Sequence, residues 1–151
     1  MTNTFSYISK SEEDTVKLGI KLSKIAKKGD CFALYGTLGM GKSVFSRALI
    51  QSLTSAKEVP SPTFTLLQTY EAKNFEIYHY DLYRLKKPEE IFELGMEEAL
   101  HEGVCLIEWP EQMKGYLPKN IFKIEITPEG KNRKITISTT DKDKAKRLEK
   151  L

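Results

Sequence analysis

Residues 31–43 read CFALYGTLGMGKS, an apolar run followed by a glycine-rich loop that ends in lysine and serine. The loop Gly36-Thr37-Leu38-Gly39-Met40-Gly41-Lys42-Ser43 matches the pattern G-x-x-x-x-G-K-[ST]. Glycines let backbone N–H groups surround phosphate oxygens, the lysine ammonium approaches the β- and γ-phosphates, and the serine hydroxyl is a ligand for Mg²⁺. We therefore predict that residues 36–43 bind a nucleoside triphosphate together with Mg²⁺.

The sequence on both sides of the loop supports this interpretation. Residues 31–35 form an apolar run typical of a buried strand. Residues 42–53 place Phe45, Ala48 and Leu49 on one helical face, which predicts an amphipathic helix. The N-terminus of that helix would direct its positive dipole end at the phosphates.

A Mg²⁺ ion in such a loop needs a further acid, commonly at the end of a neighbouring buried strand. Glu108 follows the apolar residues 104–107, and Asp81 follows the β-prone residues 75–80. Either carboxylate is a candidate. Either position is also compatible with an ordinary surface residue.

The rest of the chain alternates between strand and helix patterns. Ser9 and Ser11 each precede an acidic residue by three positions, so either could cap a helix that ends at Gly29. A second helix is expected from Pro88 to about residue 100, with Gly95 as a possible break. Further strands are expected at residues 5–8, 63–70, 75–80, 104–108, 121–127 and 134–139, and a last short helix at residues 141–151. The pattern predicts one α/β domain over residues 1–151, with a mostly parallel central sheet, flanking helices and two added β-hairpins.

Composition narrows the class of protein. Hydrophobic residues make up 40% of the chain and charged residues 30%, which is typical of a soluble globular domain. No run approaches the roughly 20 apolar residues of a membrane span, and residues 1–8 have no secretory pattern. Cys31 and Cys105 each lie in an apolar run, so we expect free buried thiols and a cytoplasmic protein.

Positive charge is concentrated at the C-terminus. Residues 131–151 contain eight Lys or Arg and three Asp or Glu, whereas the whole chain has a net charge of +3. The basic tail at residues 141–151 is compatible with a solvated segment that aids solubility. It is equally compatible with a contact to RNA or to an acidic partner protein.

Missing motifs exclude several classes. The chain has neither the N-K-x-D guanine signature nor a D-x-x-G switch, so we expect ATP in preference to GTP. His79 and His101 lack H-E-x-x-H spacing and are interpreted as structural or surface residues. Four of the seven tyrosines lie in residues 70–84, where they indicate either hairpin packing or a recognition surface.

Four segments together resemble a known family. They are the loop at residues 35–43, Ser61-Pro62-Thr63-Phe64-Thr65-Leu66, His79-Tyr80-Asp81-Leu82-Tyr83-Arg84-Leu85, and Leu106-Ile107-Glu108-Trp109-Pro110-Glu111. In this order they resemble the TsaE (YjeE) family of bacterial ATPases, which are needed to make threonylcarbamoyladenosine in tRNA. The resemblance covers nearly the whole chain and is far more specific than the loop alone.

The resemblance implies a small P-loop ATPase domain that acts with the proteins TsaD and TsaB. ATP hydrolysis would drive or reset cycles of that complex, the isolated protein would be a weak ATPase, and carbamoyl transfer would belong to the partner. By the same resemblance Lys42 holds phosphates, Ser43 and Glu108 hold Mg²⁺, and Asp81 acts in hydrolysis. Glu12 and Arg133 fall where the family contacts the nucleotide.

The chain departs from the family pattern at three places. Thr37 replaces a usual Asp, Met40 replaces a usual Ala, and Ser43-Val44 replaces a usual Thr pair. Ser43 keeps the metal-binding hydroxyl, and Val44 keeps only its backbone N–H. Two other functions use the same loop, namely a small-molecule or nucleoside kinase and a non-catalytic, nucleotide-gated interaction module. The four arginines are too dispersed to indicate a kinase lid.

Overall fold

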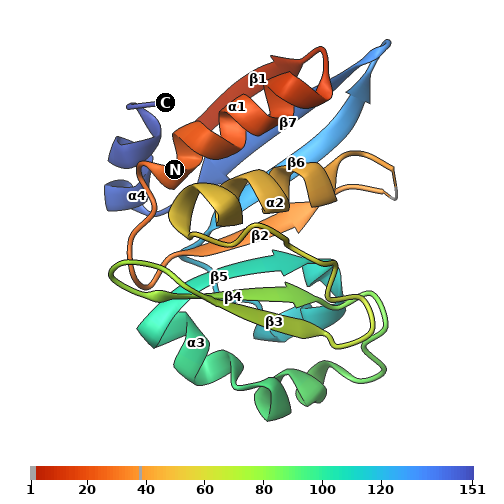
Figure 1. Ribbon diagram of the computed structural model, residues 1–151, viewed down its shortest axis with the longest axis vertical. Helices are drawn as coiled ribbons and strands as arrows, with labels where there is room; N and C mark the ends of the chain where they lie inside the picture. Colours follow the sequence, from red (N-terminus) through yellow and green to blue (C-terminus); the bar gives the residue numbers. More distant parts are fainter. Residues whose placement is uncertain (1–2, 38) are drawn as a thin grey trace.

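A seven-stranded sheet with strand order β1-β7-β6-β2-β5-β4-β3 runs through the middle of the molecule (Figure 1). The computed structural model describes residues 3–37 and 39–151. The strands are β1 Asn3–Ser9, β2 Cys31–Tyr35, β3 Leu67–Glu71, β4 Glu76–Asp81, β5 Gly103–Glu108, β6 Phe122–Glu129 and β7 Asn132–Thr139. β6, β2, β5 and β4 pair in parallel, and β1, β7 and β3 are antiparallel to their neighbours. The predicted α/β fold with a mostly parallel centre is therefore confirmed.

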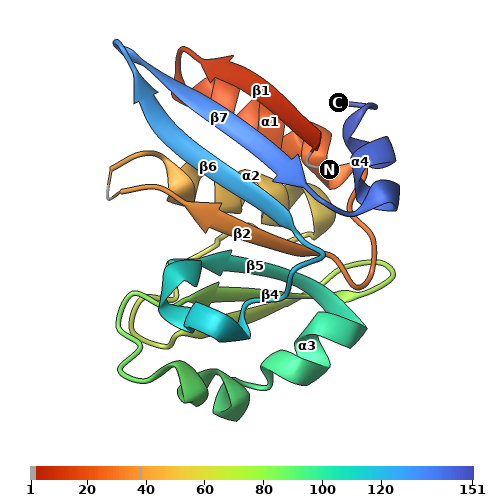
Figure 2. The ribbon, with the colours of Figure 1, turned by 180° about the vertical axis from the view of Figure 1, so that it is seen from behind.

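Helices cover the two faces of the sheet unequally (Figures 1 and 2). α1 Glu12–Ser23 and α2 Lys42–Leu53 lie on one face, where Phe45 and Leu49 join the core with Leu106. α3 Met96–Glu102 and the 3₁₀ helices η1 Pro88–Leu94 and η2 Pro110–Tyr116 lie on the other face. Figure 2 shows that the back of β1, β7 and β6 carries no helix.

The central strands β2 and β5 end at the edge of the sheet where the glycine-rich loop begins. β2 and β5 are apolar and almost wholly buried, and Cys31 and Cys105 are partners in their register. Both cysteines are buried free thiols, as predicted. Because β2, β5 and β4 are parallel, their C-terminal ends lie at the same edge of the sheet, and the glycine-rich loop follows β2 there.

The first helix begins at one of the two expected caps and ends earlier than expected. Ser11 caps α1, accepting a hydrogen bond from the Asp14 backbone at 3.2 Å, while Lys10 N–H donates to the Asp14 carboxylate at 2.9 Å. The helix ends at Ser23 rather than Gly29, because the next backbone bonds shorten to a 3₁₀-type turn. Gly29 instead adopts a φ of 93° in the turn before β2.

Two later boundaries also differ, and the possible break at Gly95 is confirmed. β3 begins at Leu67 rather than at residue 63, because a turn closed by Leu66 N–H and the Pro62 carbonyl occupies residues 62–66. The helix expected from Pro88 is split at Gly95, whose φ is 70°. Pro128 lies inside β6 and pairs with Arg133, so the β6–β7 turn is tighter than predicted.

The C-terminal basic segment packs on the domain instead of extending as a free tail. α4 Lys142–Leu148 is capped by Asp141 and buries Ala145 and Leu148. Arg147 donates two hydrogen bonds to the Asp30 carboxylate, at 2.6 and 2.8 Å. The exposed lysines of α4 keep the positive charge of this segment at the surface.

None of the helices in the described residues is long and apolar enough to span a membrane.

Candidate functional site

The loop after β2 has the backbone that a phosphate-binding turn needs. Gly36 has a φ of 153°, and a Cβ there would lie 3.0 Å from the Ile126 carbonyl oxygen. Gly41 is the N-cap of α2 with a left-handed φ of 93°, so it supplies no side chain to cover the helix end. The first turn of α2 contains no acidic residue. The free N–H groups and the positive dipole end of α2 are therefore available to an anion.

Lys42 is the most unusual side chain at this site. Only 6% of it is exposed, and its ammonium lies 3.6 Å from the centre of the Trp109 ring. Nζ has no hydrogen-bond partner among the described residues. Burial lowers the pKa of Lys42, and the nearby carboxylates of Glu108, Glu111 and Asp81 partly oppose that shift. A buried, unpaired ammonium at a helix N-terminus is suited to receive an anion.

Two buried carboxylates lie side by side at the ends of neighbouring strands. Asp81 and Glu108 are partners in the β4–β5 register and are 5% and 4% exposed. Asp81 accepts hydrogen bonds from the Thr63 hydroxyl at 3.1 Å and the Tyr83 backbone at 3.0 Å. Glu108 accepts from His79 at 2.6 Å and from Ser46 on α2 at 3.4 Å. Neither acid is an ordinary surface residue.

This pair fits a magnesium ion that also binds substrate phosphates. No group of three or more His, Cys, Asp or Glu residues able to hold a metal occurs within residues 3–37 and 39–151. Mg²⁺ is usually held by one or two carboxylates, waters and phosphate oxygens rather than by a cage of protein ligands. Two acids beside the glycine-rich loop match that requirement, and Ser43 lies in the first turn of α2, where the loop ends.

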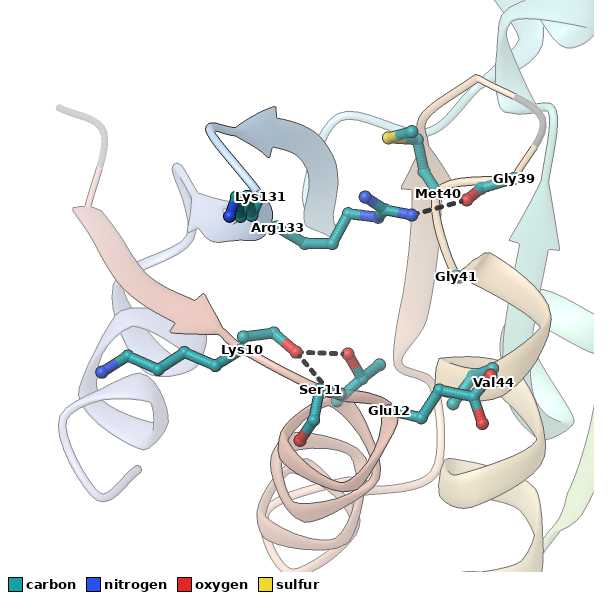
Figure 3. A pocket seen from close by; sticks show the side chains of 11 residues that line it. Lys10, Ser11, Glu12, Gly39, Met40, Gly41, Val44, Lys131 and Arg133 are labelled. Atoms are coloured by element: carbon teal, nitrogen blue, oxygen red, sulfur yellow. Dashed lines mark hydrogen bonds between the residues drawn. The ribbon is translucent and has the colours of Figure 1, made fainter.

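A pocket lies on the other side of the loop, between α1, the start of α2 and the β6–β7 hairpin (Figure 3). Arg133 reaches across it and donates to the Gly39 carbonyl at 3.0 Å. Glu12 extends from the start of α1 toward Val44, and Met40 covers the opposite side. Among the candidate residues, Leu38 lies outside the described part of the chain, and Thr37 is exposed beside the loop.

Three side chains of the site were not assigned a role from the sequence. Trp109 lies under the Lys42 ammonium, His79 holds Glu108, and Thr63 holds Asp81. His79 lies two residues before Asp81 and therefore on the same face of β4, and Trp109 directly follows Glu108. The spacing of His79 and Trp109 from the two predicted acids is therefore the sequence signal that could have indicated their roles. His79 is indeed structural, whereas His101 is exposed.

The tyrosine-rich segment divides between packing and surface. Tyr80 is fully buried and donates its hydroxyl to the Leu94 carbonyl at 3.0 Å. Tyr83 is 46% exposed and lies against Trp109, with 4.9 Å between ring centres. Phe64 is 81% exposed, and the Arg84 guanidinium lies 4.4 Å from its ring centre. Packing therefore accounts for Tyr80, whereas Tyr83 and Phe64 present aromatic surface to solvent.

Comparisons with known proteins identify the family of the chain. The family model described as threonylcarbamoyl adenosine biosynthesis protein TsaE matches residues 9–135. A Rickettsia conorii protein named tRNA threonylcarbamoyladenosine biosynthesis protein TsaE is 46% identical over 135 residues, covering 88% of this chain and 77% of the relative. A Treponema pallidum protein of the same name is 36% identical, covering 87% and 98%. The crystal structure of YdiB from Bacillus subtilis superposes with a TM-score of 0.80 at 26% identity, covering 99% of this chain and 94% of that one.

Proposed function

The chain belongs to the TsaE family, and on this premise we propose that it is an ATP-binding and ATP-hydrolysing subunit for threonylcarbamoyl modification of tRNA. The modified base is the adenosine next to the anticodon. The partners are the TsaD and TsaB proteins, which carry out the carbamoyl transfer, and the place of action is the cytoplasm. The chain alone is a weak ATPase that the complex activates.

One observation carries the ATPase part of the proposal. The buried Lys42 ammonium has no hydrogen-bond partner among the described residues, and the buried carboxylates of Asp81 and Glu108 are near enough to influence its charge. A binding module needs the lysine but has no need of two desolvated acids beside it. The same constellation serves phosphoryl transfer, in which positioning and electrostatics supply most of the catalysis.

We assign the side chains by their positions. Lys42 and the backbone N–H groups of residues 39–44 hold the phosphates, and Ser43 and Glu108 hold Mg²⁺, which neutralises developing charge. Asp81, fixed through both oxygens by Thr63 and Tyr83, orients the attacking water.

The pocket lined by Glu12, Met40 and Arg133 takes the nucleoside end of ATP. In this assignment the loop separates the nucleoside from the reacting phosphate, because the pocket and the two acids lie on opposite sides of it. The exposed lysines of α4 offer tRNA an additional basic surface, although α4 itself is packed on the domain.

Phosphate release from ATP–Mg²⁺ tests this function. We expect slow release by the wild-type chain and faster release with TsaD, TsaB and tRNA. Asp81→Asn should keep ATP binding and lose release, and Glu108→Gln should lose the Mg²⁺ dependence of binding. Glu97→Gln, at an exposed position on α3, is the matched control and should behave as wild type. Wild-type release by Asp81→Asn would overturn the assignment.

A further inference from the structure

His79 is a buried titratable residue that the proposed chemistry leaves without a task. Its side chain is 3% exposed, and its Nε2 lies 2.6 Å from Oε2 of Glu108. His79 is opposite Leu106 in the β4–β5 register, two residues before the Asp81–Glu108 pair. Alternation places His79 and Asp81 on the same face of β4, so the imidazole reaches Glu108 diagonally between the strands.

The hydrogen bonds around the imidazole are asymmetric. Nε2 contacts the carboxylate, whereas Nδ1 is buried without a hydrogen-bond partner in the described part of the chain. A bare lone pair in an apolar surrounding costs less than a bare N–H, so the pattern fits a ring that carries its proton on Nε2. In that tautomer His79 donates to Glu108.

Both hydrogen bonds that the Glu108 carboxylate accepts from described side chains end on the same oxygen. His79 Nε2 and the Ser46 hydroxyl, at 2.6 and 3.4 Å, contact Oε2. The contact with His79 is the stronger of the two, since a hydrogen bond to a charged group weakens as it lengthens. The imidazole therefore fixes the rotation of the carboxylate.

We propose that His79 is a positioning residue that holds Glu108 by Oε2 and thereby presents Oε1 to the magnesium ion or to one of its waters. The inference rests on the function proposed above, in which Glu108 serves Mg²⁺. Partners that orient metal-binding side chains typically change metal affinity by about 10–100-fold when removed. His79 acts through Glu108 and touches neither nucleotide nor water in this scheme.

Titration of Mg²⁺ into the full-length protein with a non-hydrolysable ATP analogue tests the proposal by calorimetry. His79→Leu should weaken Mg²⁺ binding by about 10-fold or more, while affinity for the analogue in EDTA stays at the wild-type value. Ile77→Val, two residues earlier on the same face of β4, is the packing control and should keep Mg²⁺ affinity within about 3-fold of wild type.

A second pair of variants separates the hydrogen bond from packing, and it also serves if His79→Leu does not fold. The side-chain nitrogen of Gln reaches the position of Nε2, whereas that of Asn reaches only the position of Nδ1. His79→Gln should therefore restore Mg²⁺ affinity, and His79→Asn should not. Equal affinities in the Gln and Asn variants would overturn the proposal, as would wild-type affinity in His79→Leu. Absence of any Mg²⁺ dependence in the wild type would instead overturn the proposed function.

Discussion

Replacing Lys42 by Met should stabilise the free protein while abolishing nucleotide binding. The ammonium is 6% exposed, has no acceptor among the described residues, and rests on the Trp109 ring. Leaving a buried donor unsatisfied costs about 1–3 kcal/mol, or more for a charge. A desolvated cation–π contact offsets about 0.5–2 kcal/mol of that cost. Met keeps the apolar stem and removes the charge, so the free energy of unfolding should rise by about 1 kcal/mol.

Thermal unfolding provides the assay. For a domain of this size 1 kcal/mol corresponds to about 2–4 °C in Tm. At 100 times the Kd, ATP–Mg²⁺ should stabilise the wild type by about 2.7 kcal/mol and leave Lys42→Met unchanged. The variant should therefore melt above the wild type without ligand and below it with ligand.

The matched control is Lys17→Met on the exposed face of α1, which should change stability by no more than about 0.5 kcal/mol. A Tm of Lys42→Met that falls below wild type without ligand would refute the reasoning, because the ammonium would then stabilise the empty site.

The pH dependence gives an independent check on the same residue. Burial lowers the folded-state pKa of Lys42 from the usual 10.5. Below the lowered pKa both the folded and unfolded chains carry the charge, so the penalty on folding is fully present. As the pH rises toward 10.5 the folded protein loses its proton first, and the penalty falls. The stability advantage of Lys42→Met should shrink over that range, and an advantage that grows would contradict the assignment.

Three further outcomes follow from the packing and the site. Arg147→Ala breaks the buried ion pair that holds α4 and should cost about 3–5 kcal/mol in urea unfolding, whereas an unchanged midpoint would show that α4 is a free tail. Gly19→Ala should destabilise by about 1–3 kcal/mol, because its Cβ would lie 2.9 Å from Ala48 Cβ, and Gly115→Ala, which meets nothing within 4 Å, should be neutral. Emission from Trp109, the single tryptophan, should change when ATP–Mg²⁺ draws the ammonium off its ring, and an unchanged spectrum at saturation would place the phosphates elsewhere.

The sequence predicted best where one local rule decides the structure. The glycine-rich loop, its strand and its helix agree with expectation because residues 31–53 combine an apolar run, a fixed motif and helical periodicity. The sequence placed Asp81 and Glu108 each at a strand end, which is correct, and the strand register shows in addition that the two are paired. Local rules also located the split at Gly95, whose left-handed backbone a glycine adopts without strain.

Long-range contacts account for what the sequence did not predict. α1 stops at Ser23 because residues 24–30 turn into β2, and Asp30 is engaged by Arg147 from the far end of the chain. The basic C-terminal segment was interpreted as a tail because Ala145 and Leu148, which the structure buries, are only two apolar residues among many charged ones in the sequence. The hydrogen bond between His79 and Glu108 joins residues 29 positions apart, which only the strand register reveals.

We propose that this chain hydrolyses ATP at Lys42, Asp81 and Glu108 in support of tRNA modification. The most direct measurement counts inorganic phosphate and threonylcarbamoyladenosine in one reaction that contains TsaD, TsaB, tRNA and ATP–Mg²⁺. The wild-type chain should release phosphate and sustain repeated modification, and Asp81→Asn should bind ATP but support neither. Modification at the wild-type rate with Asp81→Asn would contradict the account and indicate a nucleotide-gated module, and a phosphorylated small molecule in place of free phosphate would indicate a kinase.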